Sequence, residues 1–286
     1  MMNTHRIILG DCITGMKTLP DGCVQTCITS PPYFGLRDYG GGDSEIGQED
    51  TVEGYVQKMV EVFREVRRIL RDDGTLWLNL GDSYMSAKNC APPPQTQGGQ
   101  RGMPSDFVPA NRKDQKGLKT KDLIGIPWRV AFALQADGWY LRQDIIWSKP
   151  NPMPESVEDR CTKSHEYIFL LSKKPHYYYD HEAVKEITVG GAEKKNKRSV
   201  WTVNAKGYKG AHFAVYPETL IEPCVLAGCP QDGTVFDPFT GSGTTAVVAL
   251  KNGRNYIGTE LNPEYVQIAE ERIKEAVPQT LEEIFE

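Results

Sequence analysis

Ser30, Pro31, Pro32 and Tyr33 combine hydrogen-bond acceptors with an aromatic ring. They follow Thr29 and residues 24–28, an apolar-leaning run of strand formers. A double proline can continue neither a β-ladder nor a helix, so the strand must end there. The proline nitrogens carry no proton, and the local carbonyl groups and the serine hydroxyl therefore form a rigid set of acceptors. A base stacked on the tyrosine gains about 1–3 kcal/mol. The arrangement suits an exocyclic amine on a heteroaromatic base, although such residues are also common in simple turns.

A second stretch with residues suited to chemistry lies at 234–246. A short hydrophobic run ends in an acidic residue, passes through a glycine-rich turn and enters a helix at 245–250, which is the order strand, nucleotide loop, helix. Another strand at 255–258 leads to Glu260, where an acidic residue would hold a pair of ribose hydroxyls. The candidate cofactor-binding residues in this region are Asp237, Pro238, Phe239, Gly241, Ser242, Gly243, Thr244, Thr245 and Glu260.

Three kinds of nucleotide site compete for this glycine turn. A P-loop needs a lysine after its last glycine, and here Thr244 follows Gly243, which excludes it. The spacing Gly241-x-Gly243-x-x-Ala246 fits a loose dinucleotide fingerprint, so an NAD-binding Rossmann protein stays open as an alternative. In that fold, however, the strand runs straight into the first glycine. Here residues 237–239 intervene and place a carboxylate where a cationic or amino-bearing ligand would sit, so a sulfonium cofactor with an amino-acid tail fits better.

Together, Thr29-Ser-Pro-Pro-Tyr and Asp237-Pro-Phe-x-Gly-Ser-Gly-Thr-Thr resemble the paired signatures of the amino-group DNA methyltransferases. These enzymes use S-adenosyl-L-methionine to methylate adenine N6 or cytosine N4. The catalytic motif precedes the cofactor motif in this chain, which resembles the circularly permuted β class. The resemblance implies double-stranded DNA as substrate, a prokaryotic or phage-encoded cytoplasmic enzyme and base flipping, and it leaves open a homodimer and a cognate restriction endonuclease.

The order of the predicted elements fits a doubly wound, Rossmann-like α/β sheet. Strands one and two are at 234–237 and 255–258, and the amino-terminal part supplies strands three, four and five at 6–9, 24–29 and 75–80. The sheet order 3-2-1-4-5 puts strands one and four side by side at the switch point, so cofactor and base would meet in one crevice. We expect helices at 12–19, 51–70, 124–137, 217–226 and 264–276, and an antiparallel edge formed by strands at 139–147 and 165–171.

Asp11 follows the first strand at the same edge of the predicted sheet. It is placed to accept a hydrogen bond from the adenine amino group of the cofactor. The same side chain could cap the helix at 12–19, and the two roles are compatible.

Composition limits the class of protein. The 286 residues predict one catalytic domain, 1–286, and no apolar run approaches membrane-spanning length. An N-terminus without a signal-peptide pattern predicts a cytoplasmic location. Seven cysteines without a C-x-x-C pair indicate reduced buried thiols and no metal site. Pro223-Cys224 is similar to the nucleophile of cytosine-C5 methyltransferases, but its apolar helical pattern favours core packing.

Two basic clusters could contact DNA, although such clusters are usually solvated loops. They lie in residues 86–121, which we expect to be a mobile insertion, and in residues 181–210, the candidate target-recognition segment; the cofactor-binding part is 211–262. The net charge of −5 argues against a broad DNA-coating surface. The candidate DNA-binding residues are Arg37, Lys113, Lys116, Lys197, Arg198, Trp201 and Lys206.

The chemistry we expect is direct methyl transfer to an amine on a flipped base. The Ser30 hydroxyl and the Pro31 carbonyl would each accept an N–H hydrogen bond and direct the nitrogen lone pair at the methyl group, while Tyr33 stacks on the base. The resemblance favours cytosine N4, because serine at the first motif position is commoner among those enzymes. Adenine N6 is the alternative, and an RNA or protein N-methyltransferase is a more distant one.

Overall fold

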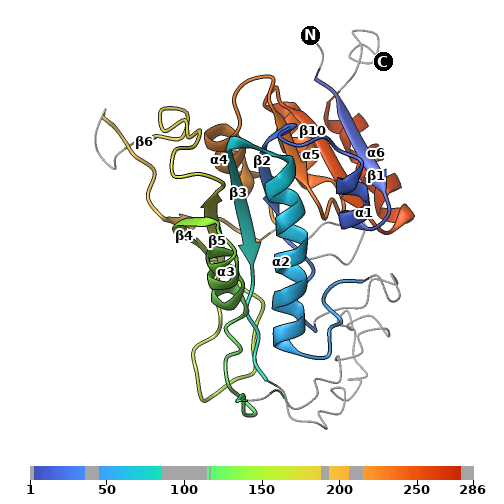
Figure 1. Ribbon diagram of the computed structural model, residues 1–286. Coiled ribbons are helices and arrows are strands. Elements are labelled where there is room, and N and C mark those ends of the chain that lie inside the picture. The colour runs from blue at the N-terminus through green and yellow to red at the C-terminus, as the bar shows by residue number, and fades with distance from the viewer. Residues whose placement is uncertain are drawn as a thin grey trace.

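The computed structural model describes residues 3–35, 45–85, 115, 117–187, 193–205 and 215–277. Within them a sheet of eight strands forms the centre of the molecule, in the order β1-β10-β9-β2-β3-β5-β4-β8 (Figure 1). Its strands are β1 (His5–Leu9), β2 (Val24–Thr29), β3 (Leu70–Leu80), β4 (Tyr140–Ser148), β5 (His165–Ser172), β8 (Val200–Thr202), β9 (Thr234–Asp237) and β10 (Asn255–Glu260). Two further strands, β6 (Glu186–Ile187) and β7 (Lys194–Lys195), pair separately.

Helices cover both faces of this sheet. One apolar cluster joins the sheet to α1 (Cys12–Lys17), α2 (Val52–Ile69) and α3 (Ile126–Ala136). The other joins it to α4 (Glu218–Gly228), α5 (Thr244–Lys251) and α6 (Pro263–Ala276). Figure 1 shows α2 in front of the strands and α4 behind them. Both faces of β2 and β9 are covered, and most of their residues are buried, polar ones included.

The predicted strand order is confirmed. The first five strands of the sheet, β1-β10-β9-β2-β3, follow the order 3-2-1-4-5, and all four pairs are parallel. The carboxyl-terminal strands β9 and β10 therefore lie between the amino-terminal strands β1 and β2. His5 of β1 also forms a 2.8 Å contact with Glu270 of α6, so the first strand and the last helix are neighbours. The circular permutation that the sequence resemblance implies stays a prediction.

The helices begin and end close to the predicted residues. Thr51 caps α2 by accepting a 3.0 Å hydrogen bond from the Gly54 N–H, and Tyr55 and Met59 of this helix are fully buried. Asn262 caps α6 in the same way, accepting from Glu264 N–H at 2.8 Å.

The far side of the sheet differs from the prediction in three respects. The antiparallel strand is β5, which lies inside the sheet between β3 and β4, and not at an edge. The edge strand is the unpredicted β8, which is parallel to β4. Finally, β3 begins at Leu70, directly after α2, and so starts five residues before the predicted strand at 75–80. Its register with β2 shifts between the pairs Val24–Leu70 and Thr26–Thr75.

Most of the predicted insertion at 86–121 lies outside the described residues, as do Arg37, Lys113, Lys116 and Lys206. Residues 117–121 are described and return to the end of β3, where Lys121 N–H donates to the Met85 carbonyl. The candidate recognition segment contains β6, β7 and β8. In the described residues no helix is long and apolar enough to cross a membrane, and no group of three metal-ligating side chains occurs.

Candidate active site

A cavity of about 400 Å³ lies at the carboxyl ends of the central strands, at the point where the sheet order reverses. Its walls come from the ends of β1, β2, β9 and β10, so segments far apart in the chain meet there. The predicted residues that line it are Asp11, Ser30, Pro31, Pro32, Tyr33, Pro238, Phe239, Gly241, Ser242, Thr244 and Glu260. The predicted catalytic and cofactor-binding stretches therefore open into one space.

The Ser30–Tyr33 stretch presents a mixture of engaged and available groups. The Pro32 carbonyl accepts a 2.8 Å hydrogen bond from the Tyr55 hydroxyl of α2, which fixes the stretch to the helix layer. Within the described residues, no protein donor reaches the Pro31 carbonyl. That carbonyl is therefore an acceptor that a ligand amine could use. The Ser30 side chain interacts with the Tyr33 phenol, and its hydroxyl oxygen keeps a lone pair for a further donor.

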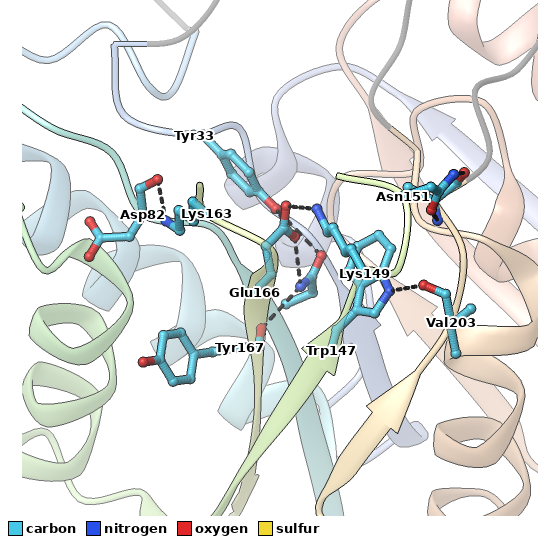
Figure 2. Close-up of polar contacts among 11 residues, drawn as sticks. Tyr33, Asp82, Trp147, Lys149, Asn151, Lys163, Glu166, Tyr167 and Val203 are labelled. Carbon is cyan, nitrogen blue, oxygen red and sulfur yellow. Dashed lines mark hydrogen bonds and ion pairs between the residues drawn. The ribbon is translucent and has the colours of Figure 1, made fainter. Parts of the chain in front are cut away.

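The phenol of Tyr33 is held by polar side chains beneath the cavity (Figure 2). Its hydroxyl donates to Glu166 Oε2 at 2.8 Å and lies 3.5 Å from Asn79 Oδ1. Burial and the Glu166 carboxylate hold the pKa of Tyr33 well above its usual value, and the nearby Ser30 side chain opposes this shift. The phenol is therefore neutral at physiological pH and can act as a donor.

The glycine turn forms the other half of the cavity. Gly241 and Gly243 have positive φ angles of 52° and 80°, which side-chain-bearing residues rarely adopt. Glu260 fixes this turn, since its two carboxylate oxygens accept from Gly241 N–H at 2.8 Å and from Asn262 N–H at 2.9 Å. Burial raises the pKa of Glu260. Each carboxylate oxygen keeps lone pairs for a further donor.

Three predicted cofactor residues, Asp237, Gly243 and Thr245, do not line the cavity. Asp237 is 1% exposed and accepts hydrogen bonds from Thr29 Oγ1 and Thr245 Oγ1, each at 2.6 Å, and from the Phe239 N–H at 3.0 Å. Burial raises its pKa and these donors lower it. The carboxylate thus joins β2, β9 and α5, and a contact between Asp237 and the cofactor stays a prediction.

Asp11 has the two features expected of it. Its Oδ1 caps α1 by accepting from Thr14 N–H at 2.9 Å, and its side chain lines the cavity. The capping bond is shown by the structure, whereas a bond to the cofactor stays a prediction.

Several lining residues were not predicted. Leu261, Asn262 and Tyr265 lie within five residues after Glu260, and the rule that sites lie beyond strand ends could have found them. Tyr216 precedes α4, lines the cavity and contacts Thr245 Oγ1 at 2.5 Å, but no motif marks it.

The described DNA-binding candidates have different surroundings. Trp201 is only 7% exposed and donates from Nε1 to the Arg198 carbonyl, so it is a core residue of β8 and offers no free ring to DNA. Lys197 and Arg198 both pair with Glu186, at 3.2 and 3.1 Å. Arg198 is 78% exposed and stays a candidate phosphate contact.

Cys224 is fully buried in α4, and burial raises the pKa of its thiol far above the usual range. A buried neutral thiol is a poor nucleophile, so core packing is confirmed for this residue. The cysteines in the described part of the chain are all free.

Curated relatives share most of the length of the chain. Type II methyltransferase M.SmaI of Serratia marcescens is 52% identical over 273 residues, which cover 95% of this chain and 91% of that protein. Type II methyltransferase M.Cfr9I of Citrobacter freundii is 50% identical over 274 residues, covering 96% and 89%.

Solved structures share the fold. The PvuII cytosine-N4-specific DNA methyltransferase aligns with a TM-score of 0.70 at 20% identity over 100% of this chain and 90% of that one. A Thermus thermophilus protein solved with S-adenosyl-L-methionine aligns with a TM-score of 0.66 at 23% identity, covering 97% and 96%. The family model described as DNA methylase, which carries the N6/N4 designation, matches residues 24–271. This family model matches most of the chain, and the two curated relatives are 50% and 52% identical to it. The protein therefore belongs to the N6/N4 DNA methylase family.

Proposed function

We propose that the protein transfers a methyl group from S-adenosyl-L-methionine to the N4 amine of a flipped cytosine in duplex DNA. The observation that carries this proposal is the shared cavity, lined on one side by the glycine turn and Glu260 and on the other by Ser30 to Tyr33. Direct transfer requires donor and acceptor in one space, and this cavity is large enough for a nucleoside-sized ligand.

The residues present suit S-adenosyl-L-methionine. Glu260 offers carboxylate lone pairs to a ribose diol, and Phe239 and Leu261 offer apolar surface to an adenine ring. Asp11 lies at the same cavity, where it can accept from an adenine amino group. When bound, the cofactor supplies an electrophilic methyl group on its sulfonium.

The protein's own contribution is positioning and hydrogen bonding. An exocyclic amine is a poor nucleophile because its lone pair is delocalised into the ring. The Ser30 hydroxyl and the Pro31 carbonyl accept its two N–H bonds and favour a pyramidal nitrogen. Tyr33 stacks on the base after flipping, which costs a few kcal/mol. No covalent enzyme intermediate is needed, in agreement with the buried, neutral Cys224.

Two observations support cytosine over adenine. Ser30 occupies the first motif position, and the PvuII enzyme that shares the fold is named cytosine-N4-specific. Adenine N6 is the competing substrate, since its amine could use the same acceptors. Both curated relatives are named Type II methyltransferases, which supports DNA as the partner, while a cognate endonuclease and a homodimer stay predictions.

The test is methyl transfer from labelled S-adenosyl-L-methionine to unmodified duplex DNA, followed by digestion and identification of the labelled nucleoside. We expect N4-methylcytosine, with much lower turnover in Ser30→Ala and Tyr33→Ala. N6-methyladenine would correct the base. Label found only in RNA or protein, or unchanged turnover in both alanine variants, would overturn the proposal.

A further inference from the structure

We propose that Glu166 is a positioning residue that fixes the Tyr33 ring for the target base, and that Lys149 holds Glu166 in place. The inference rests on the proposed function, because it assigns Tyr33 to base stacking. Glu166 itself does not line the cavity. It therefore acts through Tyr33 and touches neither base nor cofactor.

Two contacts fix the Tyr33 ring from opposite ends. Its hydroxyl donates to Glu166 Oε2 at 2.8 Å. Its ring lies against the backbone at Gly81, the residue directly after β3, where an added Cβ would sit 2.6 Å from Tyr33 Cε2. An aromatic side chain has only two rotatable bonds, so a close contact along the ring and a hydrogen bond at its tip define one orientation. Without Glu166 the Tyr33 hydroxyl loses its short hydrogen bond and keeps the 3.5 Å contact with Asn79 Oδ1 and the interaction with the Ser30 side chain, while the ring keeps the Gly81 contact.

The Glu166 carboxylate is strongly held. It is 14% exposed on β5 and accepts from three donors: Tyr33 Oη, Asn79 Nδ2 at 3.2 Å and the Lys149 ammonium (Figure 2). Asn79 is in turn fixed by donating to the Tyr167 carbonyl at 3.0 Å. A nearly buried carboxylate without such partners would be costly, so this network specifies its position.

Lys149 connects Glu166 and Tyr33 to the edge of the sheet. Its ammonium lies 4.0 Å from the centre of the Trp147 ring, and the backbone N–H of Lys149 donates to the Ser164 carbonyl at 2.8 Å. Trp147 Nε1 donates to the Val203 carbonyl at 2.8 Å (Figure 2). Asn151, two residues after Lys149, makes reciprocal hydrogen bonds with the backbone of Ala205. Lys149, which contacts Glu166, therefore lies between two residues, Trp147 and Asn151, that are hydrogen-bonded to the candidate recognition segment, 181–210.

The experiment is a double-mutant cycle of Glu166→Ala and Tyr33→Phe, with kcat and the KM for S-adenosyl-L-methionine measured in methyl transfer to DNA. Each single change removes the same hydrogen bond, while phenylalanine keeps the stacking ring. We expect Glu166→Ala to lower kcat about ten- to hundredfold with little change in KM for the cofactor. In the Tyr33→Phe background, Glu166→Ala should lower kcat by a much smaller factor. Glu166→Gln, whose carbonyl can still accept from Tyr33, should recover part of kcat.

Asp137→Asn is the matched control. Asp137 is 15% exposed and pairs with Arg64 at 2.5 Å on the helix layer, away from the cavity. We expect this variant to keep the wild-type kcat. An equal loss of kcat for Glu166→Ala in both backgrounds, or a loss expressed only in KM for the cofactor, would overturn the inference.

A second readout separates the inference from the proposed function. The same cycle is measured by urea unfolding of the ligand-free protein, where the two changes should be non-additive. If the wild type methylates no DNA, the proposed function fails, and non-additive unfolding still supports Glu166 as the residue that positions Tyr33. Additive unfolding free energies would overturn the inference whatever the activity.

Discussion

Asp237 has a structural role in the fold that the sequence did not predict. The sequence places an acidic residue at a strand end beside a glycine turn, which favours a ligand contact. In the structure its carboxylate accepts from the hydroxyls of Thr29 and Thr245 and from the Phe239 N–H, all of them protein groups. These donors come from a neighbouring strand, a helix and a loop, so the tertiary fold decides this role and sequence spacing does not.

Glu260 makes the opposite case, because its backbone partners leave lone pairs that face the cavity. Burial raises its pKa above the ordinary value of 4.5, so it protonates at higher pH than an exposed glutamate. The protonated form is a poorer acceptor for a ribose diol. We therefore expect the Kd for S-adenosyl-L-methionine to rise as pH falls from about 8 to about 5, and more steeply than in Glu260→Gln.

The sign of the folding term separates this effect from acid unfolding. A carboxyl whose pKa is raised in the folded state contributes stability below its unfolded pKa, and that contribution is lost as pH rises. Acidification therefore weakens cofactor binding through Glu260 without destabilising the fold through the same group. Calorimetric titration of cofactor across this pH range measures the effect, and parallel curves for wild type and Glu260→Gln would contradict it.

At the scale of the elements, the sequence was most informative where the strands are buried on both faces. The residues of β2, and those of β9 with the glycine turn and α5, predicted the two strands and the crevice at their carboxyl ends. The position of β5 was not predictable, because an apolar run has the same pattern in either direction. In the fold, α3 carries the chain from β3 to the parallel β4, and β5 then fills the gap between them. The three-residue β8 is too short to show a period.

The junction of the glycine turn with α6 depends on a missing side chain. Gly243 has φ 80°, and a Cβ there would lie 2.8 Å from Ala269 Cβ. We expect Gly243→Ala to cost about 2–5 kcal/mol of unfolding free energy, from backbone strain and overpacking together. Gly22→Ala is the control. Because Gly22 has φ 64° with open space around it, its replacement should lower the unfolding free energy through backbone strain alone. Urea unfolding compares the two, and equal losses would mean that contact with α6 is unimportant.

At the scale of the whole molecule, the cavity is a product of the complete sheet. Its walls come from the amino-terminal strands β1 and β2 and the carboxyl-terminal strands β9 and β10, so no half of the chain contains the site. A ligand bound there should consequently stabilise the protein as one unit. Each of the two motifs could therefore be recognised in the sequence by itself. That they lie in one cavity could be predicted only from the strand order of the sheet.

Ligand-dependent unfolding therefore tests the type of cofactor on the whole protein. A ligand present at a hundred times its Kd stabilises the folded state by about 2.7 kcal/mol, which raises the Tm by several degrees in a single transition. We expect this shift with S-adenosyl-L-methionine and none with NAD at the same concentration. Glu260→Ala should reduce the shift, because the glycine turn loses its anchor and the ribose loses its acceptor. A shift with NAD would favour a dinucleotide site, and a shift unchanged in Glu260→Ala would remove Glu260 from cofactor binding.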